Sequence, residues 1–429
     1  MLGFILIGIF ILFMSIGVPI AFVIAIIALL GISAAPYIPT VTVVTKMFNG
    51  LNSFVLLAVP LFILAANLMN RGQISQKLIN FSIAIVGHVR GGLAHANILV
   101  SMIFAGVSGA SQADTAGVGK VLIPNMIESG YDKETAVGVT AASSTIGVII
   151  PPSIPMIIYA GLTNASISSL FIAGIVPGVL IGLGMMLVVY ILAIKKGYPK
   201  YERASLKKLF KLFCESFPAL LTPIIIIGGI ITGFYTATEA AAFASLYTFL
   251  ISMFFYKTLK LKDIPDILVE TLTLSCLSLF ALAAASALGE LLGYYQIATI
   301  AEQFFTTYIT QKWLFMSIVI VFFLLIGTFM DAIPAMILFI PVILPTALKL
   351  GISPILLGIV TIITLAIGLV TPPYGLCLLI AAQIGELSIE KSFKTTALFI
   401  LVILVVLIFV AFFPNIAFFI PQKMQPNLF

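Results

Sequence analysis

The chain has 429 residues, of which 62% are hydrophobic and only 8% are charged, and its formal net charge is +6. Soluble domains carry roughly 25% charged residues, so the composition excludes a water-soluble fold and makes the lipid bilayer the solvent for nearly the whole chain. The basic residues lie in short loops between apolar runs, a membrane-protein pattern that argues against nucleic-acid binding. Three widely separated cysteines give neither a metal spacing nor a disulfide framework.

The N-terminal region lacks the basic start and small-residue cleavage site of a signal peptide, so we expect a retained helix. A helix break at Ser15 to Pro19 would make residues 1–34 two crossings and put both chain termini outside. A continuous helix over residues 2–34 would instead put the N-terminus inside. Residues 1–14 alone span only about 20 Å, so both topologies stay open.

The middle of the chain matches its C-terminal part at an offset of 221 residues without a gap. The matching residues are glycines and prolines, which shape the backbone. We therefore predict an all-α polytopic membrane protein of two repeats, residues 1–194 and 214–429, joined by a cytoplasmic linker at 195–213. Each repeat would hold about five transmembrane helices and one re-entrant helical hairpin, since transporter folds are often built from internal repeats. The matched pairs are Gly106 with Gly327, Pro124 with Pro345, Gly130 with Gly351, Gly147 with Gly368, and Pro151-Pro152 with Pro372-Pro373.

The distribution of basic residues predicts the orientation of the repeats. Seven basic residues lie between Lys195 and Lys211, which places this linker in the cytoplasm. If successive loops are assigned to alternate sides of the membrane, sixteen basic residues lie inside and four lie outside. Basic positions in one repeat match neutral ones in the other, as Arg71 matches Leu292, so the two repeats are predicted to be inverted.

Each repeat contains an apolar stretch with a polar centre. Residues 92–127 are interrupted by SGASQAD, and residues 313–349 by GTFMDAIP. Arms of about 16 residues reach only about 24 Å as helix, too short for a comfortable crossing. We interpret both stretches as re-entrant hairpins whose tips lie inside the membrane.

Each hairpin is followed by an apolar helix broken by a proline doublet, at residues 135–160 and 353–384. Prolines remove backbone donors, and carbonyl oxygens freed within the membrane need a polar cavity or a cation. We predict one Na⁺ site per repeat. The first would use Gly106, Ser108, Ser143, Ser144, Thr145, Gly147 and Ile150. The second would use Gly327, Thr328, Asp331, Thr364, Gly368 and Thr371. The supporting residues would be Ser111, Asp114, Pro151, Pro152, Ser153, Pro372 and Pro373.

Simple proline kinks are the alternative to ion sites. Asp114 and Asp331 are the acidic residues of the two tips, and we expect them to balance charge at the ion sites, although either could cap a helix instead. Lys120 is expected to snorkel or to pair within the first hairpin. Its GVGKV context lacks the glycine and the hydroxyl residue of a phosphate loop, so ATP binding is not expected. Amphipathic stretches after Arg71 and after Lys262 could be interfacial arms, or the second could begin a tilted crossing.

Several motifs together resemble a known family over essentially the whole chain. They are SGASQADTAG (108–117), IPNMIESGYD (123–132), GVIIPPSIPMIIYA (147–160), SLFIAGIVPG (169–178) and GLVTPPYG (368–375). The chain is similar to the large membrane subunit of the tripartite ATP-independent periplasmic (TRAP) transporters.

The resemblance implies an ion-transporter-type elevator fold in a multi-pass protein of the bacterial inner membrane. It also implies Na⁺-driven uptake of a carboxylate-bearing organic acid, of the dicarboxylate or sialic acid type, by elevator movement. It also implies two partners, a small four-helix membrane subunit and a periplasmic substrate-binding protein. Many relatives carry a smaller residue where Asp114 stands, which leaves the substrate open.

Three other functions compete with this interpretation. A cation-coupled antiporter or exporter of similar architecture would work without a binding protein, and a channel would conduct without a Na⁺ gradient. A membrane enzyme would need a paired acid-base or metal constellation, which the sequence does not offer.

Overall fold

The structure is a computed structural model that describes residues 2–415, 418 and 422–423. Within these residues the regular elements are helices, and α1 (Leu2–Ser15) and α2 (Ile20–Ser33) are separate. Pro19 occupies the N-cap position of α2, and Gly17 adopts a left-handed conformation with φ of 83°. The break at Ser15 to Pro19 is therefore present, as the two-crossing interpretation requires.

The other helices of the first half run to the basic linker. They are α3 (Val41–Leu51), η1 (Phe54–Leu57), α4 (Ala58–Arg71), α5 (Ile74–Val86), α6 (Gly92–Ser108), α7 (Ser111–Glu128), α8 (Lys133–Ser144), η2 (Thr145–Val148), α9 (Ile154–Thr163) and α10 (Ile167–Lys196).

The second half begins after that linker. Its helices are α11 (Leu206–Ile231), α12 (Ala237–Leu250), η3 (Ile251–Phe255), η4 (Leu261–Asp263), α13 (Ile264–Tyr294), α14 (Ile297–Tyr308), α15 (Lys312–Gly327), α16 (Ala332–Lys349), α17 (Pro354–Gly368), α18 (Leu376–Ile384) and α19 (Ile389–Phe412).

The helix boundaries of the two halves correspond at the offset of 221 residues. The bounds of α7 shifted by this offset are those of α16, and α5, α6 and α8 likewise coincide with α14, α15 and α17 to within a few residues. The inversion of one half relative to the other stays a prediction. The second amphipathic stretch lies in the 31-residue helix α13, which is long and apolar enough to cross a membrane, and this favours the start of a crossing over an interfacial arm.

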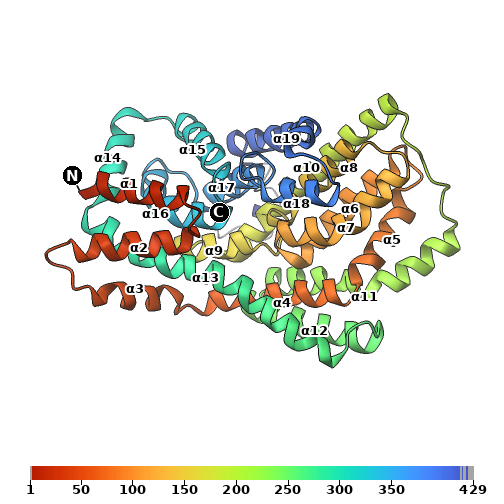
Figure 1. Cartoon of the computed structure of the whole chain (residues 1–429), viewed down its shortest axis with the longest axis horizontal. Coiled ribbons are helices and arrows are strands. Elements are labelled where there is room, and N and C mark those ends of the chain that lie inside the picture. The colour runs from red at the N-terminus through yellow and green to blue at the C-terminus, as the bar shows by residue number, and fades with distance from the viewer. Residues whose placement is uncertain (1, 416–417, 419–421, 424–429) are drawn as a thin grey trace.

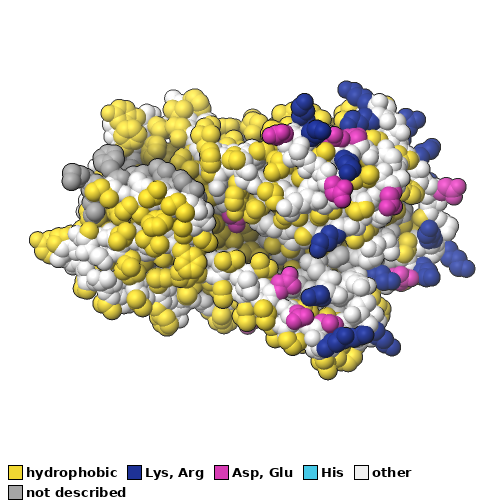
Figure 2. Space-filling view, viewed as in Figure 1, with side chains coloured by type: hydrophobic (Ala, Val, Ile, Leu, Met, Phe, Trp, Pro, Cys, Tyr) yellow, Lys and Arg dark blue, Asp and Glu magenta, His cyan; other side chains and the backbone are white. Residues whose placement is uncertain are grey.

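The described part of the chain has seven helices long and apolar enough to cross a membrane. Figure 1 shows α1, α2, α3 and α14 at one end of the molecule and the connection between α10 and α11 at the other. In Figure 2 the Lys and Arg side chains gather over this second end, while the first end is largely apolar. We call this second end the basic end; the positive-inside rule predicts that it faces the cytoplasm.

Contacts between distant segments close the basic end. Lys77 on α5 forms an ion pair of 3.2 Å with Glu215 on α11, and Tyr256 donates a hydrogen bond of 2.7 Å to the Glu215 carbonyl. Thr258 Oγ1 donates to the carbonyl of Gly72, directly after α4, at 2.5 Å. The C-terminal end of α4 therefore lies at the basic end.

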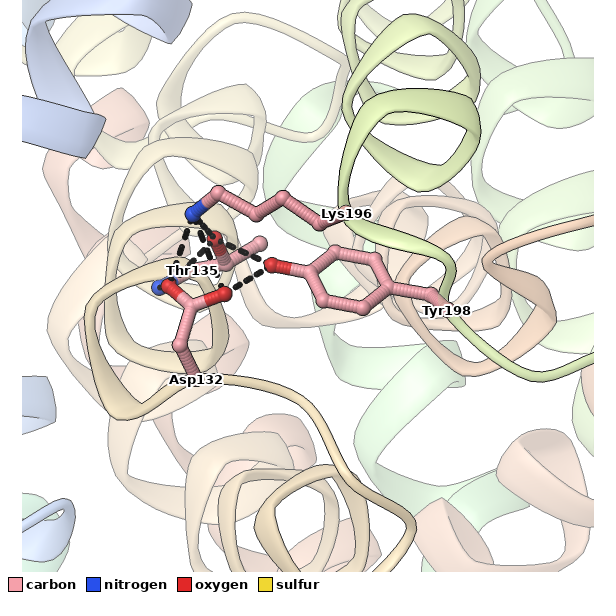
Figure 3. A network of polar contacts seen from close by, with 4 residues as sticks. All are labelled: Asp132, Thr135, Lys196 and Tyr198. Carbon is pink, nitrogen blue, oxygen red and sulfur yellow. Dashed lines mark hydrogen bonds and ion pairs between the residues drawn. The ribbon is translucent and has the colours of Figure 1, made fainter.

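Residues 197–201, called the strap below, hold the start of the linker against the first half. Asp132 accepts hydrogen bonds from Tyr198 and Lys196 and from the backbone of Thr135 at the start of α8 (Figure 3). Backbone bonds from Gly91 N to Pro199 O and from Tyr201 N to Gly87 O fasten the strap to the loop between α5 and α6. It is thus fixed at both ends.

A buried tyrosine joins the two halves at the centre of the fold. Tyr159 on α9 is fully buried and donates a hydrogen bond of 2.6 Å to the carbonyl of Pro354, at the start of α17. Its ring lies where a side chain on Gly358 would otherwise be, 2.5 Å from a Cβ built there. Close packing of this kind fixes the relative position of the two broken helices.

Candidate functional site

The tips of the two hairpins meet. In the first hairpin α6 ends at Ser108, and Gly109, with φ of 60°, turns the chain into α7. In the second, residues 328–331 separate α15 from α16. Gln112, in the first turn of α7, donates a hydrogen bond of 3.2 Å to Asp331, which occupies the N-cap position of α16 but makes no capping bond. The two tips are therefore joined directly by side chains.

Neither helix that follows a hairpin continues through its proline doublet. The first ends as α8 at Ser144, continues as the short turn η2, and resumes as α9 at Ile154; the second is interrupted between Gly368 and Leu376. Each break is bonded to the tip before it, by Ile154 N to Gly109 O at 3.4 Å and by Tyr374 N to Thr328 O at 3.0 Å. Tip and break thus form one unit in each half.

Two residues predicted for the first ion site, Ser108 and Gly147, lie beside Asp114, together with the predicted supporting residue Ser111. Ser108 Oγ donates a hydrogen bond of 2.5 Å to Asp114 Oδ1, and a Cβ built on Gly147 would lie 2.4 Å from Asp114 Oδ2. Asp114 and Ser111 are fully buried, and Asp114 Oδ2 and Ser111 Oγ have no hydrogen-bond partner. Buried oxygens without partners are rare in native proteins, so this pair is suited to a bound cation.

The other residues predicted for the first site point elsewhere. Ser143 contacts Ser101 on α6 at 3.0 Å, and the hydroxyls of Ser144 and Thr145 donate to carbonyls of their own helix. Ser153 caps α9 and donates to the carbonyl of Val148. Three further predicted residues have no side-chain hydroxyl. Gly106 packs against Pro223 near the Pro151 carbonyl, Ile150 packs against Gly178, and the Pro152 carbonyl lies near Gly109.

In the second half, two of the predicted residues, Gly327 and Gly368, are brought together through their backbones. A Cβ built on Gly368 would lie 2.4 Å from the carbonyl oxygen of Gly327. The Thr328, Thr364 and Thr371 hydroxyls donate to carbonyls of their own helices, which leaves their oxygens able to accept or to ligate. Asp331 turns towards Gln112 in the other half. Pro372 and Pro373 form the break that follows Gly368 and Thr371.

A cavity of about 1100 Å³ lies between the hairpin tips and the helices α4 and α13. The tips contribute residues from Ser108 to Gln112 and from Asp331 to Ile333, and the wall opposite includes Asn67 and Glu270. Arg71, Gln73 and Lys120 line its other end, near the basic end of the molecule. Figure 2 shows this face hollowed near its centre, beside the region where charged side chains gather.

Hydrogen bonds hold several polar side chains of the cavity wall in place. Asn67, which is buried, donates a hydrogen bond of 3.0 Å to Thr271 and so fixes α4 against α13. Ser75 donates to Asn70 at 3.1 Å. A volume of this size with a few oriented polar groups is typical of sites for small organic ligands.

Comparison with known proteins assigns this architecture to a family. Residues 7–416 match the model of the tripartite ATP-independent periplasmic transporter, DctM component. The chain belongs to this family. It is therefore an integral membrane transporter subunit of the bacterial inner membrane and not an enzyme.

Relatives of this TRAP subunit extend over its whole length. It is 36% identical to the sialic acid TRAP transporter permease protein SiaT of Haemophilus influenzae over 413 residues, which are 96% of this chain and 67% of that one. It is also 36% identical to the C4-dicarboxylate TRAP transporter large permease protein DctM of Pseudomonas aeruginosa over 377 residues, 88% of each chain. The solved structure of the Alcanivorax borkumensis YdaH transporter shares the fold, with a TM-score of 0.60 and 15% identity, covering 87% of this chain and 88% of that one.

Sequence reasoning missed the parts of this TRAP site that depend on tertiary structure. Gln112 was not singled out, although it joins the two tips, and neither was the wall formed by Asn67 and Thr271. A glutamine inside an apolar hairpin was the available signal for the first. Lys120 has no ion-pair partner within 4.0 Å among the described residues, so it does not pair within the hairpin as one of the two expectations held.

Proposed function

We propose that the chain takes up a carboxylate-bearing organic acid from the periplasm, driven by Na⁺. The observation that carries this proposal is the cavity bounded by both hairpin tips, which extends towards the basic end. Its size suits a small organic acid. The relatives named for sialic acid and for C4-dicarboxylates favour those two substrate types.

The Na⁺ coupling rests on the cluster around Asp114. The Asp114 carboxylate is buried and one of its oxygens has no partner, as is the case for the neighbouring Ser111 hydroxyl. Both lie beside a helix break. These oxygens could therefore serve as ligands for a hard cation such as Na⁺. The backbone contact of Gly327 with Gly368 would provide carbonyl ligands for a second ion. No described group of three or more His, Cys, Asp and Glu residues offers a transition-metal site instead.

An elevator movement is supported by how the cavity is walled. Each tip is bonded to its own break and the tips are bonded to one another, so these parts would move as one body. Helices α4 and α13, which form the opposite wall, are bonded to each other and would stay behind as the scaffold. Sliding of the first body against the second would expose the cavity to either side in turn.

Two partners complete the proposal. The family description is of a tripartite periplasmic transporter, and the Pseudomonas relative is named a large permease, which points to a smaller membrane companion. SiaT is longer, since this chain spans 67% of it, and the remaining third has the size for such a companion. A periplasmic binding protein would deliver the substrate, without ATP.

The test is uptake of radiolabelled N-acetylneuraminate and of succinate by proteoliposomes that contain the chain and its small membrane subunit. Uptake should require both an inward Na⁺ gradient and added binding protein. Uptake that needs the gradient but not the binding protein would favour the antiporter or exporter alternative. Flux that neither saturates nor depends on Na⁺ would indicate a channel and would overturn the proposal.

A further inference from the structure

Two cationic side chains lie at the cytoplasmic end of the cavity. Lys120 is on α7, nine residues beyond its first residue Ser111, or about 14 Å along the helix, and Arg71 is the last residue of α4. Both side chains are exposed and both line the cavity. Neither lies within 4.0 Å of a carboxylate in the described part of the chain.

A close approach of their two helices brings these cations to the same opening. A Cβ built on Gly117, three residues before Lys120, would lie 3.1 Å from Asn70 Oδ1, the residue before Arg71. The two cations therefore lie on opposite sides of one opening of the cavity, called the mouth below: Lys120 is on the hairpin and Arg71 is on the wall.

The remaining charges around the cavity do not neutralise this pair. Asp331 lies at the opposite, inner end and is bonded to Gln112. Glu270, on α13, is the other acidic residue that lines the cavity. The cavity thus has two cations at its mouth, one carboxylate on its wall and one carboxylate between the tips.

Orientation in the membrane does not by itself require Lys120. The linker and the loops at the basic end already supply the cytoplasmic positive charge. The position that matches Lys120 in the second hairpin is Pro341, and the one that matches Arg71 is Leu292. The cation pair is therefore a feature of one half only, at the cytoplasmic opening.

We propose that Lys120 and Arg71 form a cationic subsite that takes the carboxylate of the substrate as it leaves the tips for the cytoplasm. This inference rests on the proposed uptake function. In a cavity walled by protein the two charges are screened less than on an open surface, so they attract an anion towards the mouth. The substrate would pass from the tips to this subsite and then to bulk water.

The charge of the subsite is tested without transport. Ala116 also lines the cavity, one turn before Lys120, and is replaced by cysteine after the exposed Cys214 and Cys276 have been changed to serine. Inside-out vesicles are treated with sulfonatoethyl methanethiosulfonate or with its trimethylammonium analogue, and each rate is divided by that for free cysteine. The anionic reagent should have the higher normalised rate. The double change K120Q and R71Q should lower the ratio of the anionic reagent's rate to the cationic reagent's rate at least about threefold.

Single variants and a matched control keep this test decisive. K120Q and R71Q alone should each give part of the fall even if the double variant fails to insert. K133Q removes a lysine at the same end that pairs with Glu386 at 3.7 Å and does not line the cavity, so it should leave the ratio unchanged. A ratio that is the same in K120Q, R71Q and K133Q overturns the subsite.

A transport measurement decides whether the substrate uses it. In counterflow, K120Q should raise the half-saturating internal concentration of N-acetylneuraminate or succinate at least about threefold, and K120R should restore it. An unchanged half-saturation in K120Q overturns the substrate role even where the reagent ratio falls. If the unmodified chain transports neither acid, the proposed function fails, while the reagent ratio still reports on the charge of the mouth.

Discussion

Gln112 Nε2 donates a hydrogen bond of 3.2 Å to Asp331 Oδ1, although 219 positions separate these residues in the chain. The bond joins the first turn of α7 to the start of α16, and both side chains line the cavity. It ties together the two tips that the sequence repeat predicts to be equivalent. The two hairpin tips are thereby held in a fixed position relative to each other.

Replacing Gln112 by alanine should loosen the two tips. The Asp331 carboxylate would lose a donor, and hydrogen bonds to charged groups contribute about 1.5 to 3 kcal/mol, so the unfolding temperature in detergent should fall. Gln76 is a matched control, because it also lines the cavity but bonds only to Asn80 within its own helix. Equal unfolding temperatures for Q112A and Q76A would contradict the role of the bond.

Replacing Gly147 by alanine should impair Na⁺ dependence. Its Cβ would lie 2.4 Å from Asp114 Oδ2, so the carboxylate would have to move away from the proposed ion. The Na⁺ concentration for half-maximal uptake should rise about tenfold, which corresponds to about 1.4 kcal/mol. Gly228→Ala is the control, since nothing lies within 4 Å of a Cβ there. A Na⁺ titration unchanged in G147A would remove this site.

Replacing Asp114 by asparagine should abolish the charge balance at the first site while preserving side-chain size. We expect Na⁺-dependent uptake to fall at least about tenfold, with the protein still folded in size-exclusion chromatography. Asp266→Asn provides the comparison, because Asp266 is exposed in the first turn of α13. Retention of normal Na⁺ dependence in D114N would mean that Asp114 is only a structural carboxylate.

Replacing Gly368 by alanine should destabilise the second half. The new methyl group would meet the Gly327 carbonyl oxygen at 2.4 Å, and backbone cannot rotate away as a side chain would. Overpacking of this kind costs about 1 to 3 kcal/mol, measurable as a lower unfolding temperature. Gly289→Ala, with nothing within 4 Å of its Cβ, should have no such effect. A G368A protein as stable as G289A would show that this contact can relax.

The strap should depend on the charge of Asp132. Burial raises the pKa of Asp132, but hydrogen bonds from Tyr198, Lys196 and Thr135 outweigh it and hold this pKa below its ordinary value. The carboxylate therefore stabilises the fold at neutral pH, and this contribution is lost as pH falls below the ordinary pKa and through the lowered one.

Asp132→Asn should accordingly lower stability at pH 7 by about 1 kcal/mol, because the amide can still cap α8 but its hydrogen bond with Lys196 is no longer one between opposite charges. The difference from the unmodified chain should shrink on acidification, which thermal unfolding at pH 7 and at lower pH would measure. Glu128→Gln, four residues earlier and exposed, is the control. A D132N deficit that persists unchanged at low pH would contradict the electrostatic origin.

The sequence predicted the helix breaks because glycine and proline act locally. The interruptions after Ser15, at Gly109 and at both proline doublets all follow from backbone geometry that a residue imposes on its neighbours. The same reasoning could not decide the stretch after Lys262, because an amphipathic start is compatible with an interfacial arm and with the first turns of a long crossing. Packing of α13 along α2, α3 and α4 decides it.

The side-chain partners of the site could not be predicted in this way. Ser143 and Ser108 are both small hydroxyl residues near a break, yet one faces Ser101 on α6 and the other faces Asp114. Which face of a helix meets which neighbour depends on helix rotation and crossing angle, and an apolar helix buried on all sides carries no periodic signal to report it. The bond between Gln112 and Asp331 could not be predicted for the same reason.

The strap also limits how far the two halves can separate at the cytoplasmic end. Its last bonded residue is Tyr201, and α11 begins at Leu206. Five residue steps of fully extended chain measure at most about 18 Å. A covalent tether of that length limits movement at this end: the start of α11 cannot move further than this from Tyr201, so a longer stroke away from the loop at Gly87 would first have to break the bond between Tyr201 and Gly87.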